Sequence, residues 1–178
     1  MNTKDEIDQI ITQHGFNDYK WIVPRENIII SSWVRFHCQF GCKNYGKNGS
    51  CPPAVSSIEE CRQMIHEYEN AIILHFQIQS EDNNIHHKLM SELYELERTI
   101  FLAGYYKVFL LQYGSCNYCK ECNAEGIRTK CINKIKSRPG ADAMGIDIYQ
   151  TAHNIGYHIQ VVKNHNEITN RFAFMLID

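Results

Sequence analysis

The amino-acid sequence predicts an α/β protein in which helices pack on a mixed β-sheet. Two kinds of segment alternate along the chain: segments with apolar residues at helical spacing, and short β-branched and aromatic runs typical of strands. Hydrophobic residues make up 44% of the 178 residues, which is enough to bury a core. We therefore expect a single domain over residues 1–178, with two cysteine-rich loops attached to the sheet.

The N-terminal part is expected to contain one helix and two strands. Residues 5–14 carry three isoleucines at helical spacing, and Gly15 follows as a natural stop. Residues 20–23 form a short strand-like run that ends at Pro24. Residues 28–36 are β-branched and aromatic, which favours a second strand leading into the first cysteines.

The middle of the chain has a helix followed by a strand–helix–strand pattern. Residues 56–69 begin with serines followed three residues later by glutamates, as in a helix capping box. Residues 71–79 form a strongly apolar strand, residues 84–103 a long helix with leucines on one face, and residues 107–113 another strand. This order predicts a right-handed crossover between two parallel strands.

The C-terminal part is expected to form a helix and a hairpin. Residues 141–154 are interpreted as a helix that ends near Gly156, and residues 158–162 and 172–177 as two strands joined by a polar loop. A hairpin is antiparallel, so together with the parallel crossover it makes the expected sheet mixed.

Charge and hydropathy exclude several classes of function. The formal net charge is −2 and the sequence pI is about 6.5, so nothing suggests binding to nucleic acid or to an anionic membrane. No apolar run approaches the ~20 residues of a membrane span. The first six residues are polar and lack the apolar stretch of a secretory signal. We expect a cytoplasmic protein with no nucleic-acid and no membrane partner.

The chain contains eight cysteines, and most of them fall in two groups. In a reducing compartment, grouped cysteines are more often metal ligands or catalytic thiols than disulfides. A chain with this much apolar material also does not need disulfides to fold. Metal binding is therefore the first hypothesis.

The second cysteine loop, residues 114–138, has the stronger metal-binding pattern. Cys116, Cys119 and Cys122 follow one another at intervals of three, as at the start of the bacterial ferredoxin run C-x2-C-x2-C. Cys131 is the nearest candidate for a fourth ligand. This spacing favours a 4Fe–4S cluster, because zinc sites usually take two separate cysteine pairs. Structural zinc and free thiols are the alternatives.

Basic residues surround this run: Arg128, Lys130, Lys134, Lys136 and Arg138. They are interpreted either as compensation for a negatively charged cluster and a docking surface for an acidic redox partner, or as an ordinary solvated face. Arg138 is also a weak candidate for contacting a substrate.

The first cysteine loop, residues 37–53, offers three ligands: Cys38, Cys42 and Cys51. The eight-residue gap between Cys42 and Cys51 equals the gap that precedes the last cysteine of the second loop. Cys51 is followed by proline, like the cysteine that closes the ferredoxin run. The alternative is a glycine-rich loop whose cysteines merely pack.

The sequence leaves the fourth ligand of this site open among His37, Cys61, a solvent molecule and a substrate. Cys61 falls among apolar residues of an expected helix and is interpreted as a buried structural cysteine. An incomplete set of protein ligands is typical of a metal site that carries out chemistry. Lys47 and Asn48, flanked by glycines, are weak candidates for contacting an anionic ligand.

These motifs together resemble an uncharacterised family of predicted metal-binding proteins (domain of unknown function 2284), found mainly in anaerobic bacteria and archaea. The resemblance covers residues 15–178 and rests on both cysteine groups, Tyr45-Gly46-Lys47, Cys51-Pro52-Pro53, Arg138-Pro139 and Gly145-Ile146-Asp147. It implies metal binding through the seven cysteines outside Cys61 and implies no known reaction.

The chain departs from the family pattern after its last cysteine. Family members tend to have Cys-Arg-x-Pro there, where this chain has Cys131-Ile132-Asn133-Lys134. They also tend to carry Ser and Glu after the Arg-Pro pair, where this chain has Gly140 and Asp142. The cysteines are intact, so the implied ligands are kept.

The sequence therefore predicts an iron–sulfur protein with two sites. One 4Fe–4S cluster is expected on Cys116, Cys119, Cys122 and Cys131, and a second metal site on Cys38, Cys42 and Cys51. The expected work is electron transfer to a partner protein, or redox chemistry at the three-cysteine site. A zinc-binding interaction module and a metal-handling protein are the alternatives. The sequence names no substrate and no catalytic residue, and it leaves open whether the protein is an enzyme.

Overall fold

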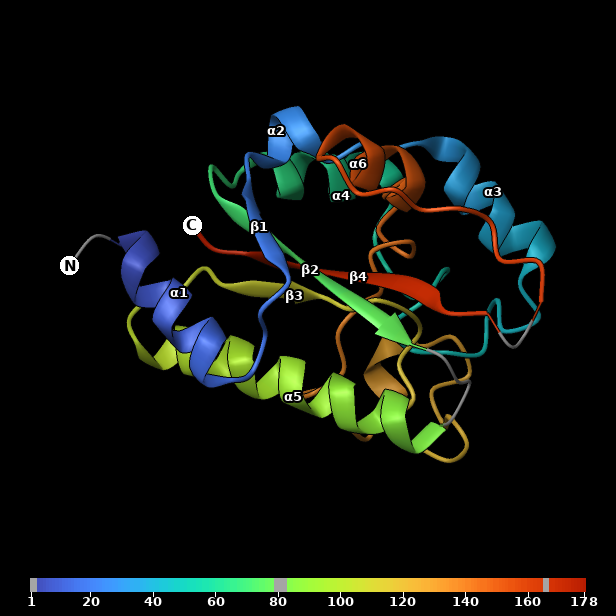
Figure 1. The fold of residues 1–178 in the computed structure, drawn as a ribbon. Coiled ribbons are helices and arrows are strands. Elements are labelled where there is room, and N and C mark those ends of the chain that lie inside the picture. Colours follow the sequence, from blue (N-terminus) through green and yellow to red (C-terminus); the bar gives the residue numbers. More distant parts are fainter. Residues whose placement is uncertain (1–2, 79–82, 165–166) are drawn as a thin grey trace.

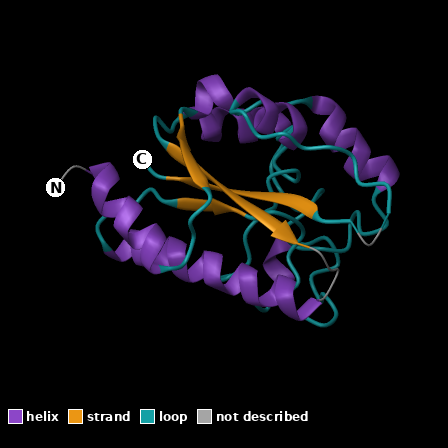
Figure 2. Ribbon diagram, in the orientation of Figure 1, coloured by secondary structure: helices purple, strands orange, loops and turns teal. Residues whose placement is uncertain are grey.

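A computed structural model of the chain describes residues 3–78, 83–164 and 167–178. Its β-sheet has four strands in the order β1-β2-β4-β3, with helices on both faces (Figures 1 and 2). The strands are β1 (Tyr19–Ile22), β2 (Ala71–Ile78), β3 (Phe109–Leu111) and β4 (Thr169–Leu176). The helices are α1 (Thr3–Gln13), α2 (Pro24–Asn27), α3 (Ser32–Gly41), α4 (Ile58–His66), α5 (Asn83–Leu102) and α6 (Ile148–Asn154), with a 3-10 turn η1 (Arg128–Lys130).

The expected parallel crossover is wrong, because every strand pair of the described sheet is antiparallel. The C-terminal strand β4 pairs with β2 from Ala71↔Leu176 to Ile78↔Thr169, and with β3 on its other side. Since β4 is antiparallel to both, β2 and β3 run in the same direction but do not touch. The sequence pattern predicted the strand, the helix and the next strand correctly. It gave no indication that the C-terminal strand β4 lies between β2 and β3.

The expected C-terminal hairpin is also wrong. Residues 158–162 form no regular element, and β4 extends over Thr169–Leu176 between two distant partners. The long register of β4 with β2 buries β4 residues on both faces of the sheet, which a short local hairpin would not do.

The strand expected over residues 28–36 is a third correction. Only Ile30 makes an isolated β-bridge, with Ile146, and α3 begins at Ser32. The aromatic residues that favoured a strand lie on the exposed side of this helix, while Val34 is its buried residue. Tertiary packing therefore outweighed the β-strand propensity of these residues.

The helix expected over residues 141–154 is shorter than predicted. Residues 141–147 form turns, and Gly145 has a φ of +84°, a left-handed conformation that interrupts a helix. Helix α6 begins after Asp147, whose side chain accepts a hydrogen bond from the Gln150 amide.

The other expected elements are confirmed, and their described ends lie within three residues of the predicted ones. Ser57 and Glu60 form the capping box of α4. Gly15 follows α1 with a φ of +83°, and Gly104 follows α5 with a φ of +107°. Residue 79, the predicted end of the strand that corresponds to β2, lies outside the described residues. No helix among the described residues is long and apolar enough to cross a membrane.

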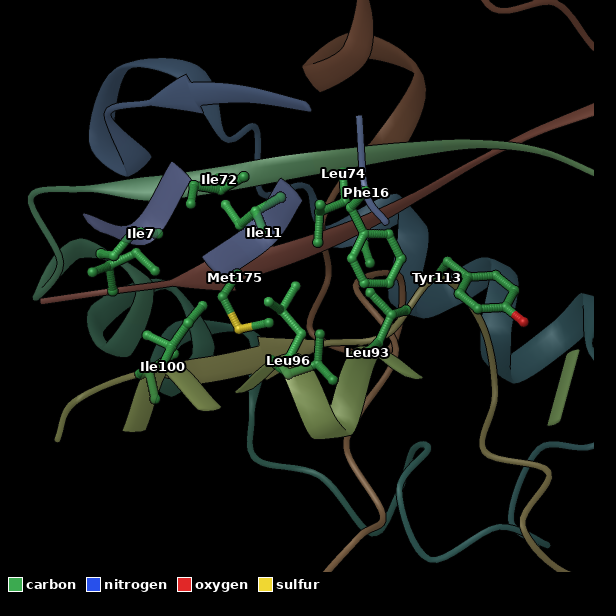
Figure 3. Packing of buried hydrophobic residues seen from close by; sticks show 14 of the residues in the cluster. Ile7, Ile11, Phe16, Ile72, Leu74, Leu93, Leu96, Ile100, Tyr113 and Met175 are labelled. Atoms are coloured by element: carbon green, nitrogen blue, oxygen red, sulfur yellow. The ribbon is translucent and has the colours of Figure 1, made fainter. Parts of the chain in front are cut away.

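The core lies on both faces of the sheet. On one face α1 and α5 pack against Ile72 and Leu74 of β2 and Met175 of β4, with Leu96 of α5 fully buried (Figure 3). Alternate residues such as Ile73 point to the other face, where α4 and α6 cover them. This period-two alternation gives a three-layer arrangement of helix, sheet and helix.

Candidate metal centre

Both cysteine loops lie at the end of the molecule opposite the two chain termini (Figure 1). The first loop starts on α3, which carries Cys38, and continues past Cys42 towards α4. The second loop leaves the sheet after β3 and contains η1. Their positions therefore follow from how α3 and β3 are anchored to the sheet and to the turns of residues 141–147.

Helix α3 is anchored through those turns. The Ser31 amide donates to the Gly145 carbonyl over 2.9 Å, and the Trp33 indole donates to the Asp147 carboxylate over 3.0 Å. Arg35 donates to the Ala143 carbonyl over 3.0 Å. These contacts explain why the Gly145-Ile146-Asp147 motif accompanies the cysteines: it positions the helix that carries Cys38.

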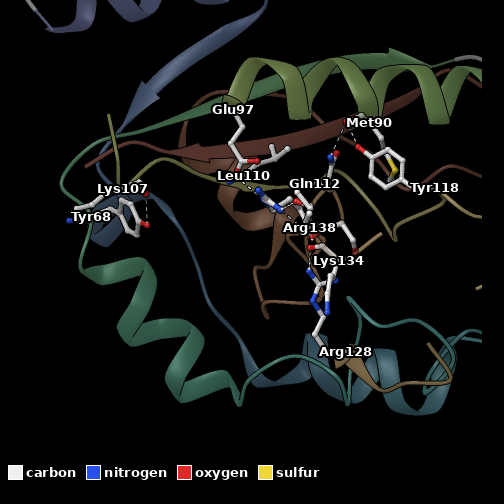
Figure 4. Close-up of polar contacts among 12 residues, drawn as sticks. Tyr68, Met90, Glu97, Lys107, Leu110, Gln112, Tyr118, Arg128, Lys134 and Arg138 are labelled. Atoms are coloured by element: carbon white, nitrogen blue, oxygen red, sulfur yellow. Dashed lines mark hydrogen bonds and ion pairs between the residues drawn. The ribbon is translucent and has the colours of Figure 1, made fainter. Parts of the chain in front are cut away.

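The second loop is anchored to α5 and β3 (Figure 4). The Glu97 carboxylate on α5 accepts from Arg138 over 2.9 Å and from the Leu110 amide over 2.9 Å. The Glu97 side chain is only 5% exposed, so the Arg138–Glu97 ion pair is largely shielded from solvent. Tyr118, inside the cysteine run, donates to the Met90 carbonyl over 2.9 Å.

The basic residues of the second loop mostly contact the loop itself. Arg128 donates to the carbonyls of Lys134 and Ser137 over 2.6 and 3.1 Å. Lys130 pairs with Glu125 over 2.7 Å. Arg138 is held in the ion pair with Glu97, which gives it a structural contact in addition to its predicted weak role towards a substrate.

The two cysteine loops touch each other at glycines. A Cβ added to Gly49 would lie 2.8 Å from the Ala124 Cβ and 3.5 Å from the Cys131 Cβ. Gly126, which has a φ of +71°, likewise has no room for a Cβ because the Gly46 carbonyl oxygen is against it. The backbones of the two loops are therefore packed directly on each other.

Cys51 lies where the two loops meet. Burial raises the pKa of its thiol to about 12, and the nearby charges of Asp142, Cys38, Cys42 and Cys116 act in the same direction. Burial, Asp142 and Cys42 also raise the pKa of Cys38, whereas the Arg35 guanidinium lowers it. Without a metal, these two thiols are therefore held in the protonated form.

Asp142 lies beside these thiols and was not predicted as a site residue. Its side chain is exposed, but desolvation by the surrounding protein atoms raises the pKa of its carboxyl. Hydrogen bonds from backbone amides and the charges of Arg171 and His37 lower this pKa, but by less. The chain gives no motif for Asp142, because its place in the site depends on the turns that follow Gly140.

The cysteine run of the second loop lines a cavity of about 750 Å³. Cys116, Cys119 and Cys122 lie on its wall, and Lys47 and Asn48 of the first loop line it as well. Arg171 of β4 also lines this cavity, and it too was missed because nothing in the strand pattern distinguishes it from a surface residue. The predicted weak candidates Lys47 and Asn48 thus face the run, but Arg138 does not line this cavity.

The remaining cysteines differ in their surroundings. Cys131 is 7% exposed and faces Gly49 of the first loop. The Asn133 side chain donates to the Cys119 sulfur over 3.1 Å. Cys42 and Cys122 are exposed.

Cys61 is buried on α4, as expected of a structural cysteine. It is 1% exposed, and its sulfur lies 3.6 Å from the Ser56 carbonyl oxygen and 3.6 Å from the Met144 sulfur. His37, the other predicted alternative for a fourth ligand, is exposed on α3 and packs edge-to-face on Trp33.

The donor set suits a thiolate-bound metal centre. Seven thiols lie in two contacting loops, and thiolates are soft ligands that suit zinc, copper(I) and iron–sulfur clusters. No group of three or more His, Cys, Asp or Glu side chains within residues 3–78, 83–164 and 167–178 is arranged to hold a metal ion as it stands.

The fold and the loops define a class: an α/β protein with a cysteine-rich end. Comparison with known families agrees, since residues 21–177 match the family described as predicted metal-binding protein (DUF2284). The chain belongs to this family, as its motifs indicated. Neither a curated protein nor a solved structure matches it.

Proposed function

We propose that this protein binds an iron–sulfur cluster, of the 4Fe–4S type, through cysteines of its two loops and acts in electron transfer or cluster-based redox chemistry. One observation carries the proposal. The C-x2-C-x2-C run lines a cavity of about 750 Å³ that residues of the first cysteine loop also line. A cluster needs several thiolates around one volume, and three cysteines line this cavity.

The residues of the two loops have separable roles. Seven cysteines would hold the metal: Cys116, Cys119 and Cys122, which line the cavity, and Cys38, Cys42, Cys51 and Cys131, which do not. Asn133 donates to the Cys119 sulfur over 3.1 Å, and hydrogen bonds to ligand sulfurs are one means by which proteins set a reduction potential. Lys47 and Arg171 bring positive charge to the cavity wall, where they would offset net negative thiolates. When bound, a cluster supplies reversible one-electron transfer.

The test is the metal content and colour of protein purified without oxygen. We expect brown protein with broad absorbance near ~400 nm, the thiolate-to-iron charge transfer of such clusters, and with iron and sulfide in equal amounts. Stoichiometric zinc without iron or sulfide would contradict the proposal. It would favour the alternatives, a zinc-stabilised interaction module or a metal-handling protein.

A matched pair of variants separates ligands from packing cysteines. Cys119→Ser should lose metal, because Cys119 lies on the cavity wall. Cys61→Ala should keep the full metal content and cost at most a few kcal/mol of stability, as the loss of a small buried side chain does. Equal metal loss in the two variants would show that Cys61 is a ligand.

Binding of a small anion distinguishes cluster-based redox chemistry from electron transfer alone. If one iron lacks a protein thiolate, cyanide should perturb the spectrum of the cluster, because such an iron exchanges its ligand. A spectrum that cyanide leaves unchanged would point to a fully ligated cluster and to electron transfer alone.

A further inference from the structure

The first cysteine loop is tied to the start of the cysteine run by a buried asparagine. The Asn48 side-chain amide donates to the Cys116 carbonyl over 2.9 Å, between residues 68 positions apart in the sequence. Its oxygen accepts from the Ser50 amide over 3.0 Å and from the Ser50 hydroxyl over 2.9 Å. Asn48 is 9% exposed, so one side chain shapes the turn before Cys51 and holds that turn on Cys116.

The glycine contacts fix the same juxtaposition from the other side. The approach of Gly49 to Ala124 and Cys131, and of Gly126 to Gly46, leaves no space for a side chain between the loops. Cys51 therefore follows a backbone segment that is packed on the second loop. The position of Cys51 relative to Cys116 is set by these contacts and not by the first loop alone.

We infer that Cys51 and Cys116 are ligands of one shared metal centre, so that the two cysteine loops form a site together and not one site each. This inference rests on the proposed function and replaces the division into one site per loop that the sequence predicted. It has a chemical precedent, because in the ferredoxin run the cysteine that precedes proline serves the other cluster. Cys51 precedes Pro52. Metal binding through Cys51 and Cys116 joins the two loops.

The decisive experiment compares Cys51→Ser, Cys116→Ser and the double variant, all purified without oxygen. Metal equivalents per chain and the electron paramagnetic resonance spectrum of the reduced protein are measured for each. A shared centre predicts that each single variant changes the same signal and loses the same metal equivalents. The double variant then loses no more than either single variant.

Two results would overturn the inference. In one, the single variants remove different signals and the double variant loses the sum of their metal equivalents. In the other, Cys51→Ser keeps the metal content and spectrum of the unmodified protein. For zinc, which gives no paramagnetic resonance signal, the metal equivalents per chain alone distinguish these outcomes.

A variant that leaves every thiol in place tests the inference should the serine variants fail to fold. Asn48→Ala removes the tie to Cys116, and Asn44→Ala is its matched control, since exposed Asn44 lines the same cavity. Asn48→Ala should perturb the resonance signal of the centre, with the circular dichroism of the fold unchanged, and Asn44→Ala should not. An unperturbed signal in Asn48→Ala would count against a centre shared between the loops.

The same measurements separate failure of this inference from failure of the proposed function. Unmodified protein without iron and sulfide refutes the iron–sulfur proposal whatever the variants do. Unmodified protein with iron and sulfide, in which Cys51 and Cys116 affect separate signals, refutes only the shared centre.

Discussion

On one face of the sheet, α5 buries Leu93, Leu96 and Ile100 completely against apolar side chains of β2 and β4. In the cysteine loops, by contrast, the contacts are single hydrogen bonds, one shielded ion pair and glycine backbones pressed together. The first kind of region is stabilised by burial of apolar surface, which needs no ligand. The second has few apolar contacts, so its structure depends on a small number of named groups and on any metal that its thiols hold.

Truncation of a core residue is the strongest test of this difference between the core and the cysteine loops. Leu96→Ala should lower the free energy of unfolding by about 2–5 kcal/mol, because it leaves a cavity in a packed interior. The metal content of the folded protein should stay unchanged, since Leu96 lies in the core and not in the loops. Chemical denaturation and metal analysis of the same sample measure both.

Leu102→Ala is the matched control on the same helix. Leu102 is 66% exposed, so its truncation should change stability by less than about 0.5 kcal/mol. A loss of metal in Leu96→Ala under native conditions would mean that the sheet and the loops are not separable.

The Arg138–Glu97 pair joins the two regions. Glu97→Gln should cost about 2–3 kcal/mol, because it weakens charge-assisted hydrogen bonds and leaves the Arg138 charge without its partner. Metal content should fall as well, since Glu97 anchors the end of the second cysteine loop.

Glu95→Gln is the control for that change. Glu95 is exposed on the same helix and lies 3.8 Å from Arg98, and exposed pairs contribute about 0–1 kcal/mol. Similar losses in Glu95→Gln and Glu97→Gln would remove the special role given to the shielded pair.

The contact between the loops is tested by adding one methyl group. Gly49→Ala places a Cβ 2.8 Å from that of Ala124, and such overpacking costs about 1–3 kcal/mol. Because the strain falls between the loops, metal binding should weaken more than the fold does. Gly114→Ala in the second loop is the control, since an added Cβ there meets nothing within 4 Å. If metal affinity is the same in both variants, the loops do not need this close approach.

The sequence predicted local features far better than distant ones. The capping box at Ser57, the apolar face of α5 and the burial of Cys61 all depend on neighbours within a few residues, and all three are confirmed. The entry of β4 between β2 and β3 depends on residues some 60 to 100 positions apart, and no local pattern records it.

The site shows the same division. The cysteine spacings indicated metal ligands, and membership of the metal-binding family supports that class of function. The placement of Asp142 and Arg171 near the cysteines, and of Cys51 near Cys116, follows from how turns and strands pack together. Spacing along the chain carries no information on such contacts.

The smallest expected effect concerns the acid stability of the sheet region around Asp18. Asp18 accepts hydrogen bonds from His75 over 2.6 Å and from Tyr157 over 2.8 Å. Burial alone would raise the pKa of Asp18, but these hydrogen bonds and the charges of His75 and Lys20 outweigh it and lower the pKa below 3.8.

A carboxyl whose pKa is lowered by folding stabilises the protein at pH values above its unfolded pKa, and this contribution is lost as the pH falls through the folded pKa. Asp18→Asn should therefore destabilise the protein at pH 6 by at most about 1 kcal/mol, since the side chain is largely exposed. The variant should lose less stability than the unmodified protein as the pH falls to about 3, because it has no such carboxylate to protonate. Thermal unfolding between these pH values measures the difference, with Glu69→Gln as an exposed control. Parallel pH curves for Asp18→Asn and the unmodified protein would show that the hydrogen bonds from His75 and Tyr157 do not favour the charged carboxylate.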